Sequence, residues 1–507
     1  MKMKNRMLSL ILAVMIASQL FCITSCTDSG TQNAIDEPSG TVSDKSDFPD
    51  TAQSESVGHE ESRLMPSLPE RDFGGADFRM LSTSPMNYGG SYVITDLTSE
   101  GLTGEGLNDA VFHRNNKISD EYKVKIVCFN SQDNNAEITK NNTSGDGMID
   151  IAFNYHILLY QMIIKNQLSD LRQIPYIDID MPWWDKNCTE TFTLYGKSYI
   201  TIGDISTTED RFVRCIFFNK NLAEQFGVND PYTLVKEDNW SMDTFREEIE
   251  KVSKDANGDG IMNDGDVFGF VTESGLPLYL FIGADGSFTK KNEDGEYYVS
   301  VYSERNLDIT HSIFELCSDK KHTILMESFK NIGGYAHCYA YARALFTQDK
   351  FLFTVQGTSA TEIFRDMESE YGILPMPKFD EAQKNFCHLV DPQTPLMVIP
   401  LVLADSEKTG IITEALAAES RYTVTPEYVE TMLKRKYARD NKSSDMLDII
   451  ADTKAYEIAF VIGLDMIYRM YWTTEVEPTA ASMKGKLKVA NKTLEKQIRK
   501  LSDENDK

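Results

Sequence analysis

The sequence ADFRMLS (76–82) is followed by LNDAVFHRNNKISDEY (107–122) and VKIVCF (124–129). The first and third segments alternate apolar and polar residues with the period of two that a half-buried strand requires. The middle segment carries apolar residues at helical spacing, and a further strand, MIDIAF (148–153), follows a Gly-Asp-Gly turn. Because parallel strands need a crossover connection, strands separated by helices are typical of a parallel sheet covered by helices.

The same alternation returns in the rest of the chain. Strands are expected in the segments KSYITIG (197–203), VRCIFFN (213–219), QDKFLFTV (348–355), YGILPMP (371–377) and PLMVIPLVL (395–403). Helices are expected at 220–226, closed by Gly227, and at 406–420, 426–438, 443–460 and 483–501. We therefore expect an α/β fold of two domains joined by crossover strands. Such domains bind ligands at the carboxyl ends of their strands and enclose a cleft.

The N-terminal segment predicts export and lipid anchoring. Three basic residues in MKMKNR (1–6) precede a short apolar run, as in a signal peptide, and the run is too short to span a bilayer comfortably. The following ITSC (23–26) resembles the lipobox of bacterial lipoproteins. We expect a signal peptide over 1–25 and a lipid on Cys26, with a simple secretory signal as the alternative. Residues 26–70 are polar and acidic, which predicts a disordered tether.

Charge and cysteine spacing exclude several classes of protein. The formal net charge of −27 argues against nucleic acid as a partner, because such binding needs clustered Lys and Arg. The chain of 507 residues is long enough for more than one domain with a substantial core. The cysteines beyond Cys26 form no CxxC pair, so neither a zinc site nor a redox motif is indicated. Disulfides and buried thiols both remain open for Cys128, Cys188, Cys215, Cys317, Cys338 and Cys387.

The segment DANGDGIMNDGD (255–266) has the spacing of a calcium-binding loop. Its oxygen ligands would be Asp255, Asn257, Asp259, the carbonyl of Ile261, Asn263 and Asp266, with Gly260 at the turn. A helix is expected before the loop and a strand, VFGFVT, after it, so neither an EF-hand sensor nor a paired dockerin repeat is indicated. We expect a structural Ca²⁺ clip. The alternative is an Asx-rich turn that binds nothing.

Several longer segments resemble the family 1 extracellular solute-binding proteins of bacterial ABC importers, many of which are sugar-binding lipoproteins. They are LPERDFGGADFRMLS (68–82), GLNDAVFHRNNKISDEYKVKI (106–126), IPYIDIDMPWWDKN (174–187), NWSMDTFREEIEKVSKDANGDGIMNDGDVFGF (239–270) and YGILPMPKFDEAQ (371–383). The resemblance implies a two-lobed, periplasmic-binding-protein-like fold of type II. Its sheets are expected to be mainly parallel, with helices on both faces and a hinge of crossover strands.

The resemblance also implies the domain boundaries and the partners. One lobe is expected to comprise approximately 71–185 with part of 340–400, and the other approximately 205–340 with part of 400–507. A monomeric receptor at the extracellular face of the cytoplasmic membrane would close on a small solute, most often a mono- or oligosaccharide. It would then deliver the solute to the permease subunits of an ABC transporter.

Sugar sites combine aromatic faces with carboxylates and amides that hydrogen-bond to hydroxyl groups. The leading candidates are Trp183, Trp184 and Asp185 in MPWWDKN and Asp204 after the following strand. The alternative for the two tryptophans is packing between the lobes, which would suit Trp184 equally well. Further candidates in polar loops are Tyr88, Asp210, Arg211, Asp285 and Asp391.

Two other functions stay open at the level of sequence. A carbohydrate-active enzyme would need a pair of carboxylates, which so acidic a chain can supply, but no GxSxG, HExxH or phosphate-binding loop is present. We therefore expect no enzymatic activity. A surface lipoprotein that docks on polysaccharide would also need an anchor, a tether and an aromatic site. It would prefer a polymer and stay open, whereas a receptor closes on a small solute.

Overall fold

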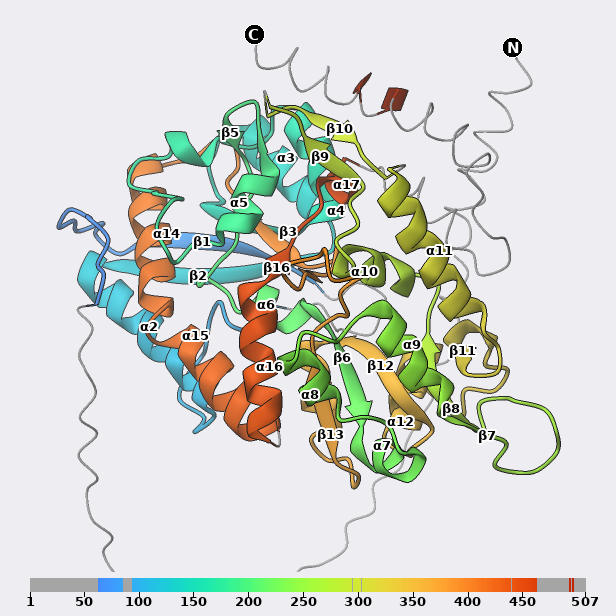
Figure 1. Ribbon diagram of the computed structural model, residues 1–507. Coiled ribbons are helices and arrows are strands. Elements are labelled where there is room, and N and C mark those ends of the chain that lie inside the picture. Colours follow the sequence, from blue (N-terminus) through green and yellow to red (C-terminus); the bar gives the residue numbers. More distant parts are fainter. Residues whose placement is uncertain are drawn as a thin grey trace, which may run out of the picture. The chain divides into compact units, whose positions relative to one another are not determined.

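The computed structural model describes residues 63–84, 94–293, 295–301, 303–438 and 440–462, together with 492–493 and 495–496 (Figure 1). The predicted signal peptide, Cys26 and Tyr88 lie outside these residues, as does most of the predicted helix at 483–501. The compact unit begins at Leu64, whose backbone N–H donates to the Tyr422 hydroxyl at 2.9 Å. Residues 64–70 therefore belong to the folded body and not to the predicted tether. No helix within the described ranges has the length and apolarity needed to cross a bilayer.

The first sheet has four strands in the order β15 (Pro395–Val398), β3 (Ile151–Tyr155), β1 (Ala76–Thr83) and β2 (Val124–Ser131). β1 is parallel to β2 and β3, and β15 is antiparallel to β3. The helices packed on this sheet are α2 (Gly106–Tyr122), α3 (Asn134–Ser144), α4 (His156–Ile164) and α14 (Ser406–Ser420) (Figure 1).

The sequence explains how the first strand, helix and strand succeed one another. The N-terminal end of α2 is capped by Glu105, whose carboxylate accepts from the backbone N–H of Asn108 at 2.9 Å. Val111, Ile118 and Tyr122 follow on the buried face of the helix. The helix ends at Lys123, which adopts a left-handed conformation with φ of 50°, and β2 begins at the next residue.

The second sheet runs in the order β11 (Thr323–Leu325), β8 (Val267–Thr272), β12 (Phe351–Gly357), β6 (Arg214–Asn219) and β13 (Tyr371–Leu374), with β7 (Ser253–Lys254) beside β8. β8 is parallel to β11 and β12, whereas β6 is antiparallel to β12 and β13. Its helices include α7 (Lys220–Phe226), α9 (Met242–Glu250), α10 (Leu276–Gly283), α11 (Glu304–Ser318), α12 (Cys338–Phe346) and α16 (Asn441–Asp452). Trp240, Phe245 and Phe353 form its aromatic core, with Phe245 and Phe353 5.1 Å apart between ring centroids.

Shorter elements complete the described chain. The short helices are η1 (Leu171–Gln173), α5 (Lys186–Phe192), α6 (Thr208–Phe212), α8 (Pro231–Lys236), η2 (Met326–Ser328), η3 (Thr358–Ala360), α13 (Thr361–Phe364), α15 (Val424–Pro426), η4 (Glu427–Tyr437) and α17 (Ile458–Val461). The short strands are β4 (Thr193–Leu194), β5 (Lys197–Ser198), β9 (Thr289–Lys291), β10 (Tyr297–Val299), β14 (His388–Leu389) and β16 (Lys454–Ala455).

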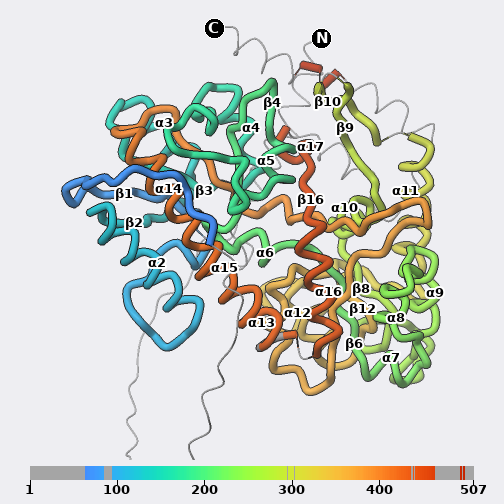
Figure 2. Tube along the Cα trace, turned by 60° about the vertical axis from the view of Figure 1, so that its left-hand side comes forward, coloured from blue at the N-terminus to red at the C-terminus, as the bar shows by residue number. Residues whose placement is uncertain are grey.

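Three segments connect the two sheets. Residues 205–213, which include α6, lead into β6, and residues 390–394 lead from β14 to β15. The third segment, 453–457, contains β16, which runs parallel to β14. Val213 and Val390 form an antiparallel bridge, so the first two crossovers are hydrogen-bonded to each other. The chain can be followed through α6 and β16 in Figure 2.

The predicted α/β class, with helix-covered sheets and crossover strands, is confirmed. The predicted helix at 406–420 agrees with α14 at both ends. The predicted helix at 443–460 is wrong between Thr453 and Glu457, because the chain leaves α16 at Asp452, residues 454–455 pair with β14, and a helix resumes only with α17 at Ile458. Among the described residues, all six cysteines that the sequence left open are free thiols. The lobe boundaries stay a prediction.

Candidate ligand-binding site

The candidate site lies at one edge of the second sheet. Since β8 and β12 are parallel, their carboxyl ends reach the same edge, and the antiparallel β6 begins there. Glu273 follows the last residue of β8, Gln356 is the penultimate residue of β12 and Arg214 is the first residue of β6. Three strands therefore bring a carboxylate, an amide and a guanidinium to one place, as expected for a ligand site of an open α/β sheet.

A cavity of about 270 Å³ occupies this edge. Its polar and aromatic wall includes Arg214, Glu273, Tyr279, His337, Tyr339, Arg343, Gln356, Asp391 and Gln393. Asp391 and Gln393 come from the second crossover, so the cavity lies against the connection between the two sheets. A small polar ligand would meet hydrogen-bonding groups together with tyrosine rings, the combination that sugars require.

Arg214 and Asp391 form a buried ion pair at the centre of the wall. The Asp391 carboxylate is 1% exposed and accepts two hydrogen bonds from the Arg214 guanidinium, one of them from Nε at 2.9 Å. The Tyr279 hydroxyl donates to Asp391 Oδ2 at 3.0 Å, and the guanidinium carbon of Arg214 lies 4.6 Å from the centroid of the Tyr279 ring. Asp391 Oδ1 accepts from the backbone N–H of Gln393 at 2.8 Å. The pair is thus fixed from several directions, which preorganises the wall.

Glu273 gives the cavity a carboxyl group that titrates near neutrality. Burial raises its pKa to about 7, and the charge of Glu327 adds to this effect while Arg214 opposes it. The His337 imidazole, which also lines the cavity, caps α12 by accepting from the backbone N–H of Ala340 at 3.1 Å. Burial and the nearby Arg343 lower the pKa of His337, which favours the neutral ring that capping requires.

The two predicted tryptophans belong to the interior of the protein. Trp183 and Trp184 are 0% and 4% exposed, and their indole N–H groups donate to the two oxygens of the Glu414 carboxylate, each at 3.0 Å. Neither ring face is open to a solute in this structure. The prediction that they stack on a sugar is therefore corrected to the packing alternative, since α14 supplies the partner that fixes both rings.

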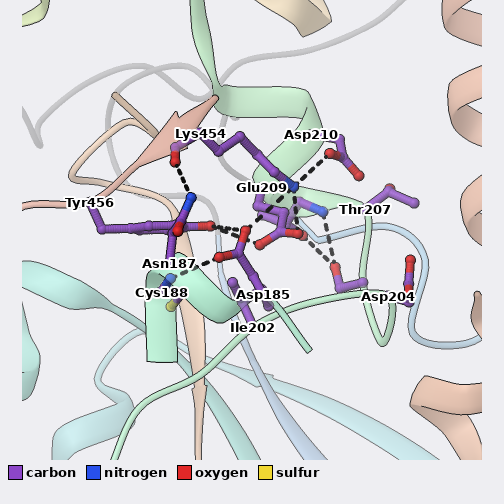
Figure 3. Close-up of polar contacts among 12 residues, drawn as sticks. Asp185, Asn187, Cys188, Ile202, Asp204, Thr207, Glu209, Asp210, Lys454 and Tyr456 are labelled. Carbon is purple, nitrogen blue, oxygen red and sulfur yellow. Dashed lines mark hydrogen bonds and ion pairs between the residues drawn. The ribbon is translucent and has the colours of Figure 1, made fainter. Parts of the chain in front are cut away.

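Asp185 and Asp210 meet in a buried cluster at the crossovers (Figure 3). Lys454 Nζ donates to Glu209 at 2.7 Å and to Asp210 at 3.0 Å, and it lies 3.6 Å from Asp185. The Tyr456 hydroxyl lies 2.8 Å from Glu209 and 3.2 Å from Asp185. Burial opposes the charge of Lys454, but the three carboxylates hold its pKa well above the ordinary value. We call these five residues the crossover cluster; it joins α5, α6 and β16 and does not line the cavity.

The other predicted contacts are spread over the body. Asp204 is held by Arg421 at 3.2 Å, and burial raises its pKa to about 6. The Arg211 guanidinium donates to the Thr95 hydroxyl at 2.9 Å. Asp285 is exposed and has a positive φ of 62°. Of the predicted residues that the structure describes, Asp391 is the one that lines the cavity.

Sequence reasoning missed most of the cavity wall. Arg214 lies in the segment VRCIFFN, whose apolar residues indicate a buried strand and not a ligand site. Glu273 directly follows the strand VFGFVT, and a carboxylate at the carboxyl end of a strand could have indicated a ligand site. Tyr339 and Arg343 are four residues apart on α12, so they share one helical face. The spacing in HCYAYAR (337–343) could have indicated that face.

Solved structures with this architecture are known. They include a cyclo/maltodextrin-binding protein complexed with maltotetraose (12% identity, 85% of this chain and 97% of that chain, TM-score 0.51). A binding protein for cyclic α-maltosyl-1,6-maltose from Arthrobacter globiformis is similar (12% identity, 84% of this chain and 99% of that chain, TM-score 0.52). The galacto-N-biose/lacto-N-biose I-binding protein of an ABC transporter from Bifidobacterium longum, in complex with lacto-N-biose, is also similar (13% identity, 85% of this chain and 99% of that chain, TM-score 0.52). The fold is that of a two-lobed solute-binding protein. No family model and no curated protein matches the sequence.

Within this two-lobed fold, the loop 255–266 connects the antiparallel strands β7 and β8. Its side chains bind its own backbone: the Asp255 carboxylate accepts from the N–H groups of Gly258 at 2.6 Å and Gly260 at 2.7 Å. Asp266 accepts in the same way from Ala256 at 2.9 Å and from Asn263 at 2.8 Å. The described residues contain no group of three or more His, Cys, Asp or Glu side chains placed to hold a metal ion. These contacts are those of the Asx-turn alternative, and the Ca²⁺ clip stays a proposal.

Proposed function

We propose that the protein is an extracellular, lipid-anchored solute-binding receptor of family 1, which captures a mono- or oligosaccharide and delivers it to an ABC transporter permease. The observation that carries this proposal is the cavity at the carboxyl edge of the second sheet, with the Arg214–Asp391 pair and two tyrosines in its wall. The similarity in fold to receptors solved with maltotetraose and lacto-N-biose supports it. The lipobox-like sequence ending at Cys26 supports the anchor.

Binding would proceed by closure of one lobe on the other. The cavity wall is built partly from the second crossover, so a solute in the cavity contacts the segment about which the lobes move. A solute that binds the closed form more tightly shifts the population toward that form. The crossover cluster limits this motion because it joins three segments through buried hydrogen bonds.

The proposal is tested by thermal unfolding and calorimetry of the full chain in detergent with glucose, maltose, maltotetraose and lacto-N-biose. A ligand at one hundred times its Kd stabilises the folded state by about 2.7 kcal/mol. Glu273→Gln removes a cavity carboxylate and is expected to weaken binding about tenfold or more, since a hydrogen bond to a charged group contributes about 1.5–3 kcal/mol. Asp285→Asn, an exposed aspartate outside the cavity, is the matched control.

The same sample separates the two alternative functions. Glu273 and Asp391 place two carboxyl groups in one cavity, so glycoside hydrolysis has a specific observation in its favour. Against it, Asp391 is engaged by Arg214 and Tyr279 and is not available as a base. Release of reducing sugar that Glu273→Gln abolishes would establish an enzyme. Binding of polysaccharide without compaction, measured by small-angle scattering, would establish a docking protein.

A further inference from the structure

A two-stranded hairpin extends from the helices of the second sheet toward those of the first. Its strands β9 and β10 are antiparallel and lie in the chain between α10 and α11. The hairpin runs from α10 toward β4 and α17 (Figures 1 and 2). We call residues 287–293 and 295–300 the strap. Since an isolated two-stranded hairpin is marginally stable at best in water, the strap depends on the elements that it contacts.

The base of the strap is fixed to the helices of the second sheet. Asn306, in the first turn of α11, donates from its amide to the carbonyls of Ser287 at 3.0 Å and Ser300 at 2.9 Å, one on each arm of the hairpin. Phe288 packs on Phe281 of α10 with 4.9 Å between the ring centroids. The strap is therefore expected to move together with α10 and α11.

The strands of the strap contact the C-terminal end of α5. Lys291 Nζ donates to the carbonyl of Glu190 at 2.7 Å, and the Tyr297 hydroxyl donates to the carbonyl of Thr191. The last carbonyls of a helix have no partner within the helix, and a cation at this end also interacts favourably with the helix dipole. Lys291 Nζ lies 4.9 Å from the centroid of the Tyr297 ring, so the two side chains form one contact surface.

The helix that receives these bonds is held by the first sheet. The hydroxyl groups of Thr189 in α5 and of Thr201 are hydrogen-bonded at 2.8 Å. Thr201 in turn forms an antiparallel bridge with Met397 of β15, a strand of the first sheet. The strap thus joins the helices of the second sheet to an element of the first sheet.

A second contact of the strap is buried. The Glu457 carboxylate, at the end of the third crossover, accepts from the backbone N–H of Phe288 at 3.0 Å and from the Thr289 hydroxyl. Glu457 also caps α17 by accepting from the backbone N–H of Ala459 at 3.1 Å. The rings of Phe288 and Phe460 meet edge to face with 6.0 Å between their centroids. Because α17 packs on α4, this contact also leads to the first sheet.

The helix α10 connects the strap to the cavity. Leu278 and Tyr279 of α10 line the cavity, and the Tyr279 hydroxyl donates to Asp391 in the second crossover at 3.0 Å. The same helix carries Phe281, on which the strap packs. A displacement of the strap would therefore be transmitted through one helix to the second crossover.

We propose that the strap is a fourth, non-covalent connection between the two lobes, and that the lobes separate only when its contact with α5 is released. The three crossovers are covalent and persist in every arrangement of the lobes, whereas hydrogen bonds can break and form again. The contact with α5 is the weaker of the two, because Lys291 is exposed and Tyr297 half-buried, while Glu457 is buried. Elements that move are drawn from such regions of low local stability.

Amide hydrogen exchange of the full chain in detergent, without any sugar, tests the strap. Lys291→Met with Tyr297→Phe removes both donors to α5. Exchange is expected to accelerate at least about fivefold in the strap and in the second crossover, 390–394, because the loss of two hydrogen bonds shifts an opening equilibrium by that factor or more. The matched control is Lys290→Met with Tyr298→Phe, which makes the same changes at exposed neighbours on the opposite face of the strands.

The control is expected to exchange at wild-type rates in both segments. Lys291→Met alone is expected to give a smaller acceleration, and Lys291→Arg, which keeps the cationic donor, to exchange like the wild type. Acceleration confined to the strap, with unchanged rates at 390–394, would identify a local anchor and overturn the inference. Equal acceleration in the control would also overturn it. Because no sugar is present, these outcomes leave the receptor function untouched, and a failure to bind sugars leaves the strap untouched.

Discussion

Lys454→Met removes the only cation of the crossover cluster while keeping most of the apolar side chain. The Glu209, Asp210 and Asp185 side chains are 5%, 14% and 9% exposed, so water cannot replace the lost ammonium group. Breaking a buried ion pair by removing one partner costs about 3–5 kcal/mol. Over the compact unit Leu64–Lys507, an unfolding entropy of ~2.1 cal/mol/K per residue converts this loss into a fall in Tm of about 3–5 °C.

Differential scanning calorimetry at pH 7 measures the effect. The control is Lys442→Met, which breaks an ion pair with Asp230 whose two side chains are 54% and 42% exposed. Loss of this exposed ion pair is expected to lower the free energy of unfolding by no more than about 1 kcal/mol. A second variant, Lys454→Met combined with Glu209→Gln, is expected to recover part of the stability, because one buried carboxyl group no longer needs a counter-charge. The reasoning is refuted if Lys454→Met and Lys442→Met lower Tm equally.

Further predictions concern pH, calcium and the anchor. Burial raises the pKa of Glu414 from 4.5 to about 7, so the folded state retains a proton that the unfolded state loses. The contribution of Glu414 to the free energy of unfolding therefore declines as pH rises from about 4.5 to 7. In Glu414→Gln, this decline should be absent from the pH dependence of Tm. If Ca²⁺ binds the loop 255–266, EDTA lowers Tm in the wild type but not in Asp255→Asn with Asp266→Asn; an unchanged wild-type Tm contradicts the clip. Cys26→Ser is expected to move the protein from the membrane to the soluble fraction on cell fractionation, and retention in the membrane contradicts the lipid anchor.

The elements that local sequence specifies were predictable. The helix α14 begins after Asp405, whose side chain accepts from the backbone N–H of Lys408, and α7 ends at Gly227 in the left-handed conformation with φ of 66°. These signals act within one turn of the helix, so a single sequence contains them. The fold class followed because strands and helices alternate over the whole chain.

The residues that depend on distant pairing were not predictable in the same way. Residues 454–455 continue a segment of helical composition, but the backbone N–H groups of His388 and Val390 donate to Thr453 and Ala455, and these bonds favour the strand. Trp183 resembles a sugar-stacking residue until its partner Glu414, 231 positions away, is known. For the same reason the candidate site was predicted at Asp391 but not at Arg214, since only the sheet order brings them together.

The free thiols have a consequence for biogenesis. Burial raises the pKa of Cys128 to about 11 and of Cys317 and Cys387 to about 12, so little reactive thiolate exists at neutral pH. If the chain is exported as proposed, folding of the described residues needs neither an oxidase nor a disulfide isomerase, because their six cysteines are free thiols. The stability of this part of the chain is then expected to be the same in strictly anaerobic surroundings and after exposure to thiols.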